Sequence, residues 1–383
     1  MKHQKRLIIV SEFVDDEINS TGLYWNKIIR SLLNSNATIE VISSTSSLAR
    51  SNFENLGFVC HGVNPPQFAS KKLFSRIINK SLLSISILLR MIRVIKRKDI
   101  VFTGTNPNIL LLLTTLLNKV TKFKWILLVH DIFPENTIPA KILKGSSLLY
   151  KMLFSLYQYV YSTPIHLITI GRDMLKLMKE KTNSRVSFIP NFADPKILNL
   201  KHDKKENEYI SFFYSGNLGE LQDLENIFLA FKYLSSKDKK FLFSGNGSKK
   251  NKIKELCKQY KEFGVKFIEN DIDQNSADIS LVPLKSGMYG LAVPSKAYFS
   301  LAYDKPLLVI GDYESELAMM INENNDVGWF VEAGNPKKLA ALIDSIEEKQ
   351  LQRMKGKPRQ LAEKKYNFEI VSLDYQRVIG EYL

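Results

Sequence analysis

The chain has 383 residues, 45% of them hydrophobic, and a formal net charge of +15. This length and composition predict two domains of a globular protein. The two cysteines, Cys60 and Cys257, exclude a disulfide scaffold and favour a reducing compartment. We expect no signal peptide, because no long apolar segment precedes a small-residue cleavage site, and Ile109–Leu117 is too short an apolar run to span a bilayer.

The positive charge lies in the first half of the chain. Residues 1–190 contain 26 Lys and Arg against 11 Asp and Glu, whereas residues 191–383 contain 28 of each kind. The stretch 71–98 carries nine basic residues, no acid and many interleaved aliphatic residues. This pattern favours a helix on an anionic membrane surface, and the alternative is a core-facing helix with a solvated basic back. Because the interleaved residues are mostly aliphatic, we expect no nucleic-acid partner.

The first half alternates short apolar strands with helical patterns. In chain order we predict strand 7–13, helix 21–33, strands 38–43 and 58–63, helix 71–97, strand 100–104, helix 107–117, strand 125–130, helix 146–160, strand 167–171, a helix from residue 172, and strand 186–190. Strands that are apolar throughout, separated by helices, indicate a parallel sheet covered on both faces.

The polar stretch 193–209 predicts a linker, after which the alternation starts again. We predict strand 210–215, helix 221–234, strand 240–244, helix 248–260, strands 265–268 and 279–284, helix 295–303, strand 307–311, helix 314–321, strand 329–331 and helices from residue 336. The predicted fold class is therefore α/β, with Rossmann-like domains at 1–192 and 208–365. Ligands of such sheets bind beyond the carboxyl ends of the strands, which places the site in a cleft between the domains.

The candidate residues of the first half follow predicted strands. No G-x-G-x-x-G follows the first strand, so we expect no dinucleotide cofactor. Thr21 and Gly22 begin a helix, where they can cap it or contact a substrate. His130 and Asp131 end an apolar strand, where the cleft is expected, although a single His is usually structural. Asp131 and Glu135 can bind acceptor hydroxyls or cap the next helix.

Three glycine-containing turns follow strands of the second half. They are centred on Gly216, on Gly245 with Gly247, and on the loop 285–295 that leads into an apolar helix. Backbone N–H groups in such turns can face a diphosphate. A D-x-D at Asp271 and Asp273 has a spacing that can hold a divalent cation, but the tripeptide is common by chance, and we expect no metal.

Several of these stretches together resemble a family of glycosyltransferases. The resemblance rests on YSGNLGELQDLE, FLFSGNGS, the segment from Ala277 to Asp312 and GWFVEAGNPKKLAALI, with HDIFPE and TIGRDM in the first half. These motifs are similar to family 4 retaining glycosyltransferases of the GT-B fold. The form LVPLK followed by GLAVPSK is most similar to bacterial surface-polysaccharide transferases of the fucosaminyltransferase and colanic-acid type.

The resemblance implies two Rossmann-like domains with parallel sheets facing across a cleft. The first domain would bind the acceptor through Thr21, Gly22, Asp131, Glu135 and Arg172, and a C-terminal helix within 366–383 would pack back on it. The second would bind the nucleotide-sugar, through residues that the resemblance places as follows: Gly216, Asn217, Leu218, Gly245, Gly247, Phe267, Ile268, Gly290, Leu291, Pro294, Ser295 and Tyr298. No cofactor or metal is implied.

The sequence departs from the family pattern at the donor site. Most members have two glutamates here. Phe299 stands at the position of the second, which usually holds the ribose, and no acid occurs near 288–291, where the first is expected. An expected Arg and Lys are replaced by Asn217 and Gln222. Other cations must then stabilise the leaving diphosphate, and the candidates are Lys285, Lys296 and Arg172. We also expect backbone N–H groups of Gly290 and Leu291 to hold the phosphate or sugar.

The resemblance therefore implies an enzyme that transfers a hexosyl or N-acetylhexosaminyl group with retention, and the candidate catalytic residues of this sequence are His130, Lys285 and Lys296. The expected donor is a nucleotide-sugar, with UDP favoured. The expected acceptor is a polyprenyl-diphosphate-linked saccharide of a surface polysaccharide such as O-antigen or capsule. The expected location is cytoplasmic, peripheral at the inner face of the cytoplasmic membrane. The alternatives are a nucleotide-sugar epimerase of the same fold and an inactive partner subunit.

Overall fold

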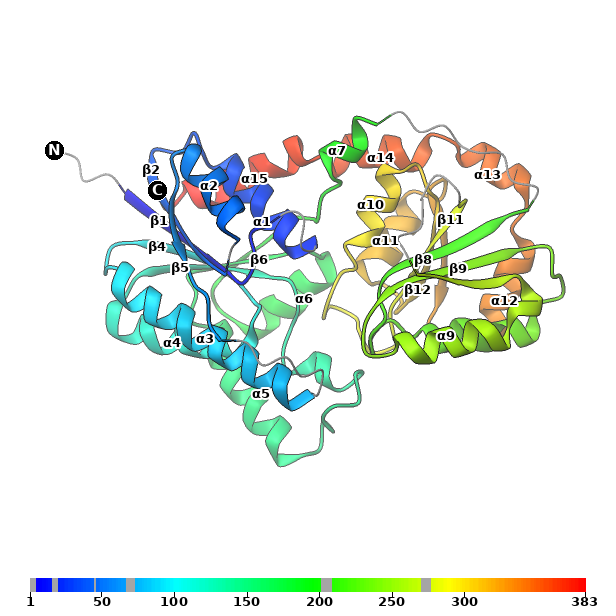
Figure 1. Cartoon of the computed structure of the whole chain (residues 1–383), viewed down its shortest axis with the longest axis horizontal. Helices are drawn as coiled ribbons and strands as arrows, with labels where there is room; N and C mark the ends of the chain where they lie inside the picture. Colours follow the sequence, from blue (N-terminus) through cyan, green and yellow to red (C-terminus); the bar gives the residue numbers. More distant parts are fainter. Residues whose placement is uncertain (1–4, 16–19, 45, 67–72, 201–208, 270–276) are drawn as a thin grey trace.

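The structure is a computed structural model that describes residues 5–15, 20–44, 46–66, 73–200, 209–269 and 277–383. Two α/β domains stand side by side, with the chain passing from one to the other through the short helix α7 (Figure 1). The predicted fold class is confirmed. Within the described residues, no helix is both long enough and apolar enough to cross a membrane.

The first domain is built on a seven-stranded parallel sheet in the order β3-β2-β1-β4-β5-β6-β7. Its elements are β1 (Lys5–Ser11), α1 (Ser20–Ser31), β2 (Ala37–Ser43), α2 (Ser47–Asn55), β3 (Val59–Gly62), α3 (Leu73–Val94), β4 (Ile100–Gly104), α4 (Asn108–Thr121), β5 (Lys124–Val129), η1 (Glu135–Thr137), α5 (Leu148–Tyr161), β6 (His166–Thr169), α6 (Arg172–Lys181) and β7 (Arg185–Phe188). The five residues of β4 are all buried, because helices cover both faces of the sheet.

The second domain has a six-stranded parallel sheet in the order β10-β9-β8-β11-β12-β13. The linker holds α7 (Pro195–Leu198), and the domain follows with β8 (Ser211–Asn217), α8 (Leu224–Ala230), η2 (Phe231–Tyr233), β9 (Lys240–Asn246), α9 (Lys250–Gln259), η3 (Lys261–Phe263), β10 (Val265–Ile268), β11 (Ile279–Pro283), α10 (Lys296–Ala302), β12 (Leu307–Gly311), α11 (Glu316–Glu323), β13 (Gly328–Glu332), α12 (Pro336–Ser345), α13 (Glu348–Met354), α14 (Lys357–Lys365) and α15 (Phe368–Gly380).

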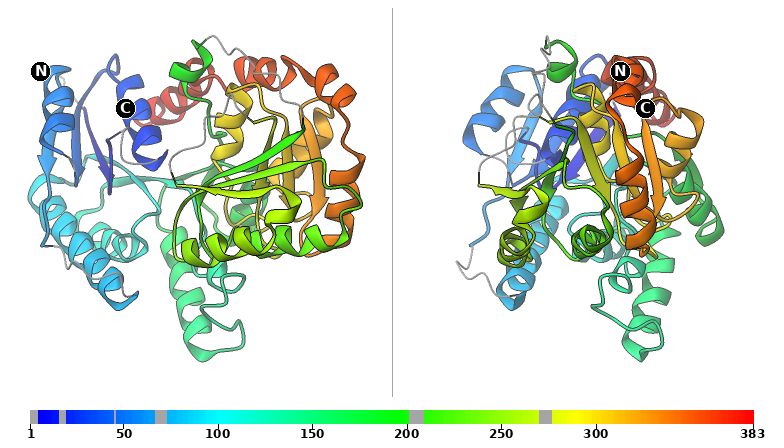
Figure 2. Two further views of the ribbon diagram at one scale, coloured as in Figure 1. Left: turned by 45° about the vertical axis from the view of Figure 1, so that its right-hand side comes forward. Right: turned by 90° about the vertical axis from the view of Figure 1, so that its right-hand side faces the viewer.

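The last helix, α15, returns to the first domain and lies beside α1, as Figures 1 and 2 show. The bond from the Ala193 amide to the Tyr366 carbonyl (2.7 Å) marks the point where the chain crosses back. The side chain of Gln376 donates to the carbonyl of Ser31, and the Tyr382 hydroxyl lies 3.0 Å from Nδ1 of His166. The first domain is therefore completed by the end of the chain.

The two domains share one apolar core. A continuous cluster of buried side chains contains Ile9 and Leu127 of the first sheet together with Val293, Leu301 and Val371. A separate cluster fills the outer side of the second domain. Since burial of apolar surface is the main favourable term in folding, the shared cluster holds the two sheets in a fixed relation at the cleft.

Candidate active site

A pocket of about 390 Å³ lies between the two domains. Its second-domain wall is formed where β8 and β11 end, which is the place where the strand order of that sheet reverses. The lining residues come from both domains: Ser20, Asp131, Tyr214, Gly216, Asn217, Leu221, Gln222, Pro283, Leu284, Met288, Ala292, Val293, Pro294, Ser295, Lys296 and Phe299. The volume lies within the range of small-ligand sites.

Lys296 places an amine without a hydrogen bond in this pocket. Its Nζ is buried, and among the described residues it has no hydrogen-bond partner. It lies 3.2 Å from the centroid of the Tyr214 ring and close to Gly216, on which a Cβ would stand 3.9 Å from Nζ. Burial holds the pKa of this amine well below its usual range. An anion bound here would supply the missing partner and restore the charge of the ammonium.

Glycine at the ends of β8 and β9 is required by close packing of the backbone. The two strands carry the same tripeptide in register, because Ser215, Gly216 and Asn217 pair with 244–246. Gly245 has φ +136°, and a Cβ there would lie 1.8 Å from the Gly216 carbonyl oxygen. No L side chain fits at that distance, so Gly245 supports the pocket from behind and does not line it.

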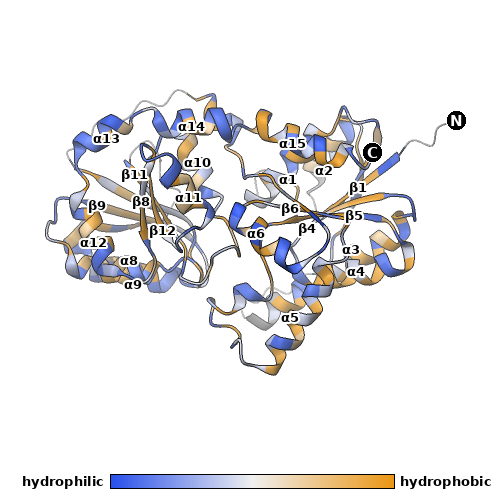
Figure 3. Ribbon diagram, turned by 180° about the vertical axis from the view of Figure 1, so that it is seen from behind, coloured by the Kyte–Doolittle hydropathy of each residue, from blue (hydrophilic) through white to orange (hydrophobic). Residues whose placement is uncertain are grey.

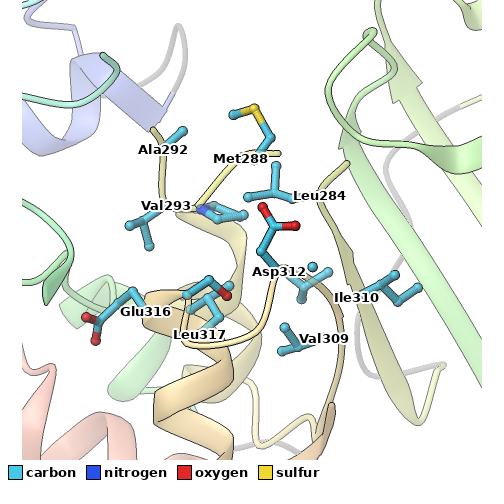
Figure 4. Close-up of a pocket in the computed structure, with 13 residues that line it drawn as sticks. Leu284, Met288, Ala292, Val293, Val309, Ile310, Asp312, Glu316 and Leu317 are labelled. Carbon is cyan, nitrogen blue, oxygen red and sulfur yellow. The ribbon is translucent and has the colours of Figure 1, made fainter. Parts of the chain in front are cut away.

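The loop that carries Met288 and Gly290 is held by two carboxylates. Asp312, after β12, accepts from the amides of Gly287 (3.0 Å) and Tyr289 (2.7 Å), and Asp173 of the first domain accepts from the amide of Gly290 (3.0 Å). Figure 4 shows the Asp312 side chain pointing towards this loop. Gly290 has φ +69°, and a Cβ there would lie 3.2 Å from the Asp173 carbonyl, so glycine permits the close approach.

Two backbone donors that the sequence assigned to the phosphate are therefore already bonded. The amide of Gly290 donates to Asp173, and the amide of Leu291 donates to the carbonyl of Met288 (3.0 Å). In this arrangement neither N–H group is available to a phosphate, contrary to the prediction, because the Gly290 amide docks the loop on the first domain and the Leu291 amide closes a turn within the loop. The carbonyl of Leu291 is bonded as well, to the amide of Ile132 (3.0 Å).

Arg172 pairs with the second domain and does not line the pocket. Its amide (2.7 Å) and its Nε (3.0 Å) donate to Glu316, and its Nη1 donates to Glu323. Burial raises the pKa of Glu316, and the bonds from Arg172 oppose that rise. Glu316 points towards the first domain in Figure 4. The guanidinium is thus used to join α6 to α11, and the predicted role at the acceptor or diphosphate does not fit this geometry.

Asp131 brings the first domain to the pocket. It forms an isolated antiparallel bridge with Ala292, so the segment after β5 and the glycine loop lie side by side. Asn106 donates to Asp131 Oδ2 (3.3 Å), and burial raises the pKa of this carboxyl. Asp131 lines the pocket from the first domain, whereas Lys296 lines it from the second.

His130 and Glu135 lie outside the lining of the pocket. Nε2 of His130 is buried without a hydrogen-bond partner among the described residues, and burial lowers the pKa of the imidazole to about 4. The ring is therefore neutral at pH 7 and lies 6.5 Å from the Trp25 ring. Glu135 pairs with Lys181 within the first domain, so its charge is already neutralised.

The remaining predicted residues fall into two groups. Gly216, Asn217, Pro294, Ser295 and Lys296 line the pocket together with Asp131. The others lie away from the pocket. Leu218 and Tyr298 are buried in the core, and Gly247 packs against the Leu218 backbone. Phe267 lies under the ammonium groups of Lys250 and Lys254, and Ile268 packs near Phe213. Lys285 donates to the carbonyl of Glu220, and Gly22 approaches the Asp15 carbonyl. Thr21 follows the pocket residue Ser20 in α1.

The positions that depart from the family pattern do line the pocket. Phe299 is half-buried, 6.1 Å from the Tyr24 ring, so an aromatic face stands where the glutamate was expected. Gln222 accepts from the amide of Gly219 (3.1 Å) and thereby shapes the turn after β8. Among the described residues that line the pocket, Lys296 is the one with a basic side chain.

Sequence reasoning missed the carboxylates that hold the site: Asp173, Asp312 and Glu316. Asp312 directly follows a strand and Glu316 begins a helix, which are positions that could have drawn attention to them. A second, apolar pocket lies under the same loop, but its volume of about 10 Å³ has room only for water. Within the described residues, no cluster of His, Cys, Asp and Glu could hold a metal, and Asp271 and Asp273 lie outside them.

Comparison with known proteins identifies the family of this chain. Residues 196–368, which include the β8, β11 and loop walls of the pocket, match the family described as "Glycosyl transferases group 1". The chain is 36% identical over 393 residues to the "Probable glycosyltransferase WbjE" of Pseudomonas aeruginosa, covering 96% of both chains. The chain belongs to the group 1 glycosyl transferases.

Two further comparisons of this glycosyltransferase have lower sequence identity. It is 27% identical over 199 residues to the "Putative colanic acid biosynthesis glycosyl transferase WcaI" of Escherichia coli, which covers 47% of this chain and 48% of that one. The crystal structure of Anabaena HepE in complex with UDP and glucose superposes with a TM-score of 0.70 at 10% identity, covering 98% of this chain and all of the other. At that identity the similarity concerns the fold.

Proposed function

We propose that this glycosyltransferase moves a sugar, with retention, from a UDP-sugar to a lipid-linked saccharide in surface-polysaccharide biosynthesis. The observation that carries the donor half is the buried Lys296 amine beside Gly216, which has no hydrogen bond among the described residues and lies where the strand order reverses. An amine in that position suits a diphosphate. The structure of HepE with UDP supports the choice of uridine.

Sugar transfer requires the pocket to stabilise the negative charge that develops on the leaving diphosphate. Transfer breaks the bond between the anomeric carbon of the sugar and the terminal diphosphate oxygen, and the leaving UDP gains negative charge. Lys296, protonated when the diphosphate is bound, stabilises that charge by a direct electrostatic contact. With retention, the acceptor hydroxyl attacks on the face from which UDP leaves, and its proton passes to the leaving diphosphate. His130, whose pKa is lowered by burial, does not line the pocket, so no step of this proposal uses it.

Residues of both domains line one pocket, which favours an enzyme that binds two substrates there. Asp131 from the first domain and Lys296 from the second line the same space, so an acceptor can meet the donor there. An epimerase would act on the nucleotide-sugar alone. The proposed acceptor is a polyprenyl-diphosphate-linked saccharide, of O-antigen or capsule type, and the name of the relative WcaI, a colanic acid biosynthesis enzyme, supports a polysaccharide pathway.

A lipid-linked acceptor requires the enzyme to work at the membrane surface. We assign that contact to the basic segment 71–98, at the inner face of the cytoplasmic membrane. Helix α3 exposes one aliphatic stripe that includes Ile77, Ile85, Leu89 and Ile92, while Arg93 beside it is also exposed. Exposed aliphatic residues next to cations suit a layer of anionic lipid headgroups. Lys71 and Lys72 lie outside the described residues.

The test is a thermal-shift and calorimetry screen of UDP-, GDP- and other nucleotide-sugars with the full chain. A specific donor raises the melting temperature by mass action. Product analysis with and without a lipid-linked acceptor then separates transfer from epimerisation. No stabilisation by any UDP-sugar would refute the proposed donor, and conversion of the donor sugar without acceptor would favour the epimerase.

A further inference from the structure

Helix α5 and the loop before it form a projection from the first domain. In Figures 1 and 2 this segment extends away from the body of the molecule, on the side where α3 and α4 lie. Its inner face is anchored: Tyr157 and Tyr161 are buried, and the Tyr157 hydroxyl donates to the carbonyl of Asn108 (2.9 Å). The projection is therefore a fixed part of the domain.

The outer face of this projection is apolar and exposed. We call it the α5 apolar surface, made of Ile142, Leu148, Leu149, Met152 and Leu156. Leu148 is 74% exposed and Met152 is 62% exposed. Leu148, Met152 and Leu156 repeat every four residues and so share one side of the helix. Figure 3 shows hydrophobic colouring along α5. Several large aliphatic side chains together on one exposed face mark an interaction surface.

The segment that carries this surface has only basic charges of its own, although Asp223 of the second domain lies near enough to Lys141 to interact with it electrostatically. Between Glu135 and Asp173 the chain contains no acidic residue, while Lys141, Lys144 and Lys151 are all exposed there. Glu135 itself is paired with Lys181. Aliphatic side chains flanked by lysines match an anionic bilayer, in which the apolar residues enter the acyl boundary and the ammonium groups meet phosphates.

The same charge pattern argues against a second copy of the chain as the occupant. A two-fold symmetric contact would bring the α5 apolar surface against its own copy. Lys144 and Lys151 would then face the equivalent lysines, and like charges brought together at an interface cost free energy. An acidic bilayer has no such conflict.

The projection also borders the candidate active site. A Cβ placed on Gly287, in the loop of the second domain, would lie 3.8 Å from Cβ of Pro139 at the start of the projection. A lipid-linked saccharide held at the membrane would thus emerge close to the pocket mouth. We propose that the α5 apolar surface inserts into an anionic membrane and positions the acceptor headgroup at the cleft. This inference rests on the proposed lipid-linked acceptor.

The test is co-sedimentation of the full chain with vesicles of phosphatidylcholine containing phosphatidylglycerol, and with phosphatidylcholine alone. We expect binding to the anionic vesicles and at least a tenfold weaker partition for the triple variant Leu148→Gln, Leu149→Gln, Met152→Gln. Lys144→Gln with Lys151→Gln should weaken partition roughly fivefold for each lysine. Leu373→Gln on α15, where Leu373 is also 62% exposed, is the matched control and should bind as the parent does.

Each outcome has a defined meaning. Equal vesicle binding by the triple variant and the parent would overturn the inference. A parent that is dimeric by light scattering, with a monomeric triple variant, would assign the surface to a second copy and also overturn it. UDP binding in solution is measured on the same samples and should be unchanged in the triple variant. Loss of UDP binding in the parent itself would count against the proposed function, whereas the vesicle result would still decide the membrane contact.

Discussion

Two cations stand on the two sides of the cleft, and their surroundings are opposite. Arg172 of the first domain donates from its amide and side chain to Glu316 and also pairs with Glu323. Lys296 of the second domain has a buried Nζ with an aromatic ring beside it and no hydrogen bond among the described residues. A fully paired cation joins domains, whereas an unpaired buried one costs free energy until a ligand arrives. Arg172 therefore joins the two domains, whereas Lys296 is available to bind a ligand.

The largest expected effect concerns the paired side. Glu316→Gln leaves the guanidinium with a neutral partner, and we expect the free energy of unfolding to fall by about 2–3 kcal/mol, since Glu316 is only 2% exposed. Urea unfolding followed by circular dichroism measures this change. Asp374→Asn is the control, because the Asp374–Arg377 pair is exposed and should contribute less than about 1 kcal/mol. Equal effects of the two variants would remove the structural role assigned to Arg172.

The next effect concerns the unpaired side. Lys296→Met should weaken UDP binding about 30-fold, equivalent to about 2 kcal/mol for a charge-assisted contact. Isothermal titration calorimetry measures the dissociation constant. In the absence of ligand the same variant should be more stable than the parent, because it removes a buried polar group without a hydrogen bond.

Lys285→Met is the matched control for this variant. The Lys285 ammonium donates to the carbonyl of Glu220 and does not line the pocket, so UDP affinity should change less than about threefold. A larger loss of UDP affinity in Lys285→Met than in Lys296→Met would mean that Lys285, and not Lys296, binds the diphosphate.

The pH dependence of binding sharpens the same contrast. Burial lowers the pKa of free Lys296, whereas a bound diphosphate would raise it, so binding takes up a proton at pH values between the two. UDP affinity should therefore fall as pH rises, by up to about tenfold per pH unit above pH 7, where the phosphate is already ionised. Calorimetry in buffers of different ionisation enthalpy counts the protons. If UDP affinity depended on pH equally in Lys296→Met and the parent, the proton taken up on binding would belong to another group.

The smallest expected effect concerns the loop between the two cations. Asp312→Asn leaves the side chain able to accept from one amide and replaces the other acceptor with a donor, so one of the bonds to Gly287 and Tyr289 is lost. A looser loop should raise the KM for the donor about fivefold, with kcat changed less. Steady-state kinetics measures both values. A fall in kcat alone would mean that Asp312 acts in chemistry and not in holding the loop.

The arrangement of the strands could be predicted from local pattern. The apolar runs of β1, β4 and β5 are buried in the sheet centre, and their positions agree with the prediction to within about two residues. Helix α2 was missed, because its residues are mostly polar and Phe53 gives a single deeply buried anchor. Its Ser46 cap, which accepts from the amide of Ala49, is too common a local feature to identify a helix alone.

The site was predicted only in part. Gly216, Pro294 and Lys296 could be found because they lie where strands end and helices begin, which is a local property. Gly245 also carries a readable local signal, but it serves backbone packing and not the ligand. The amide of Gly290 looked available in the sequence and is bonded in the fold.

The sequence by itself determined the two parallel sheets, the glycine turns beyond their strands and the basic first half, because side-chain periodicity and backbone preference act over a few residues. Only the tertiary structure decided which polar groups remain available. Asp173 meets Gly290, and Arg172 meets Glu316, across more than one hundred residues of chain. Such pairs depend on how the two domains pack, and no local pattern specifies them. Among the residues that the structure describes, that packing leaves the Lys296 amine at the pocket without a hydrogen bond, whereas Arg172 is fully paired.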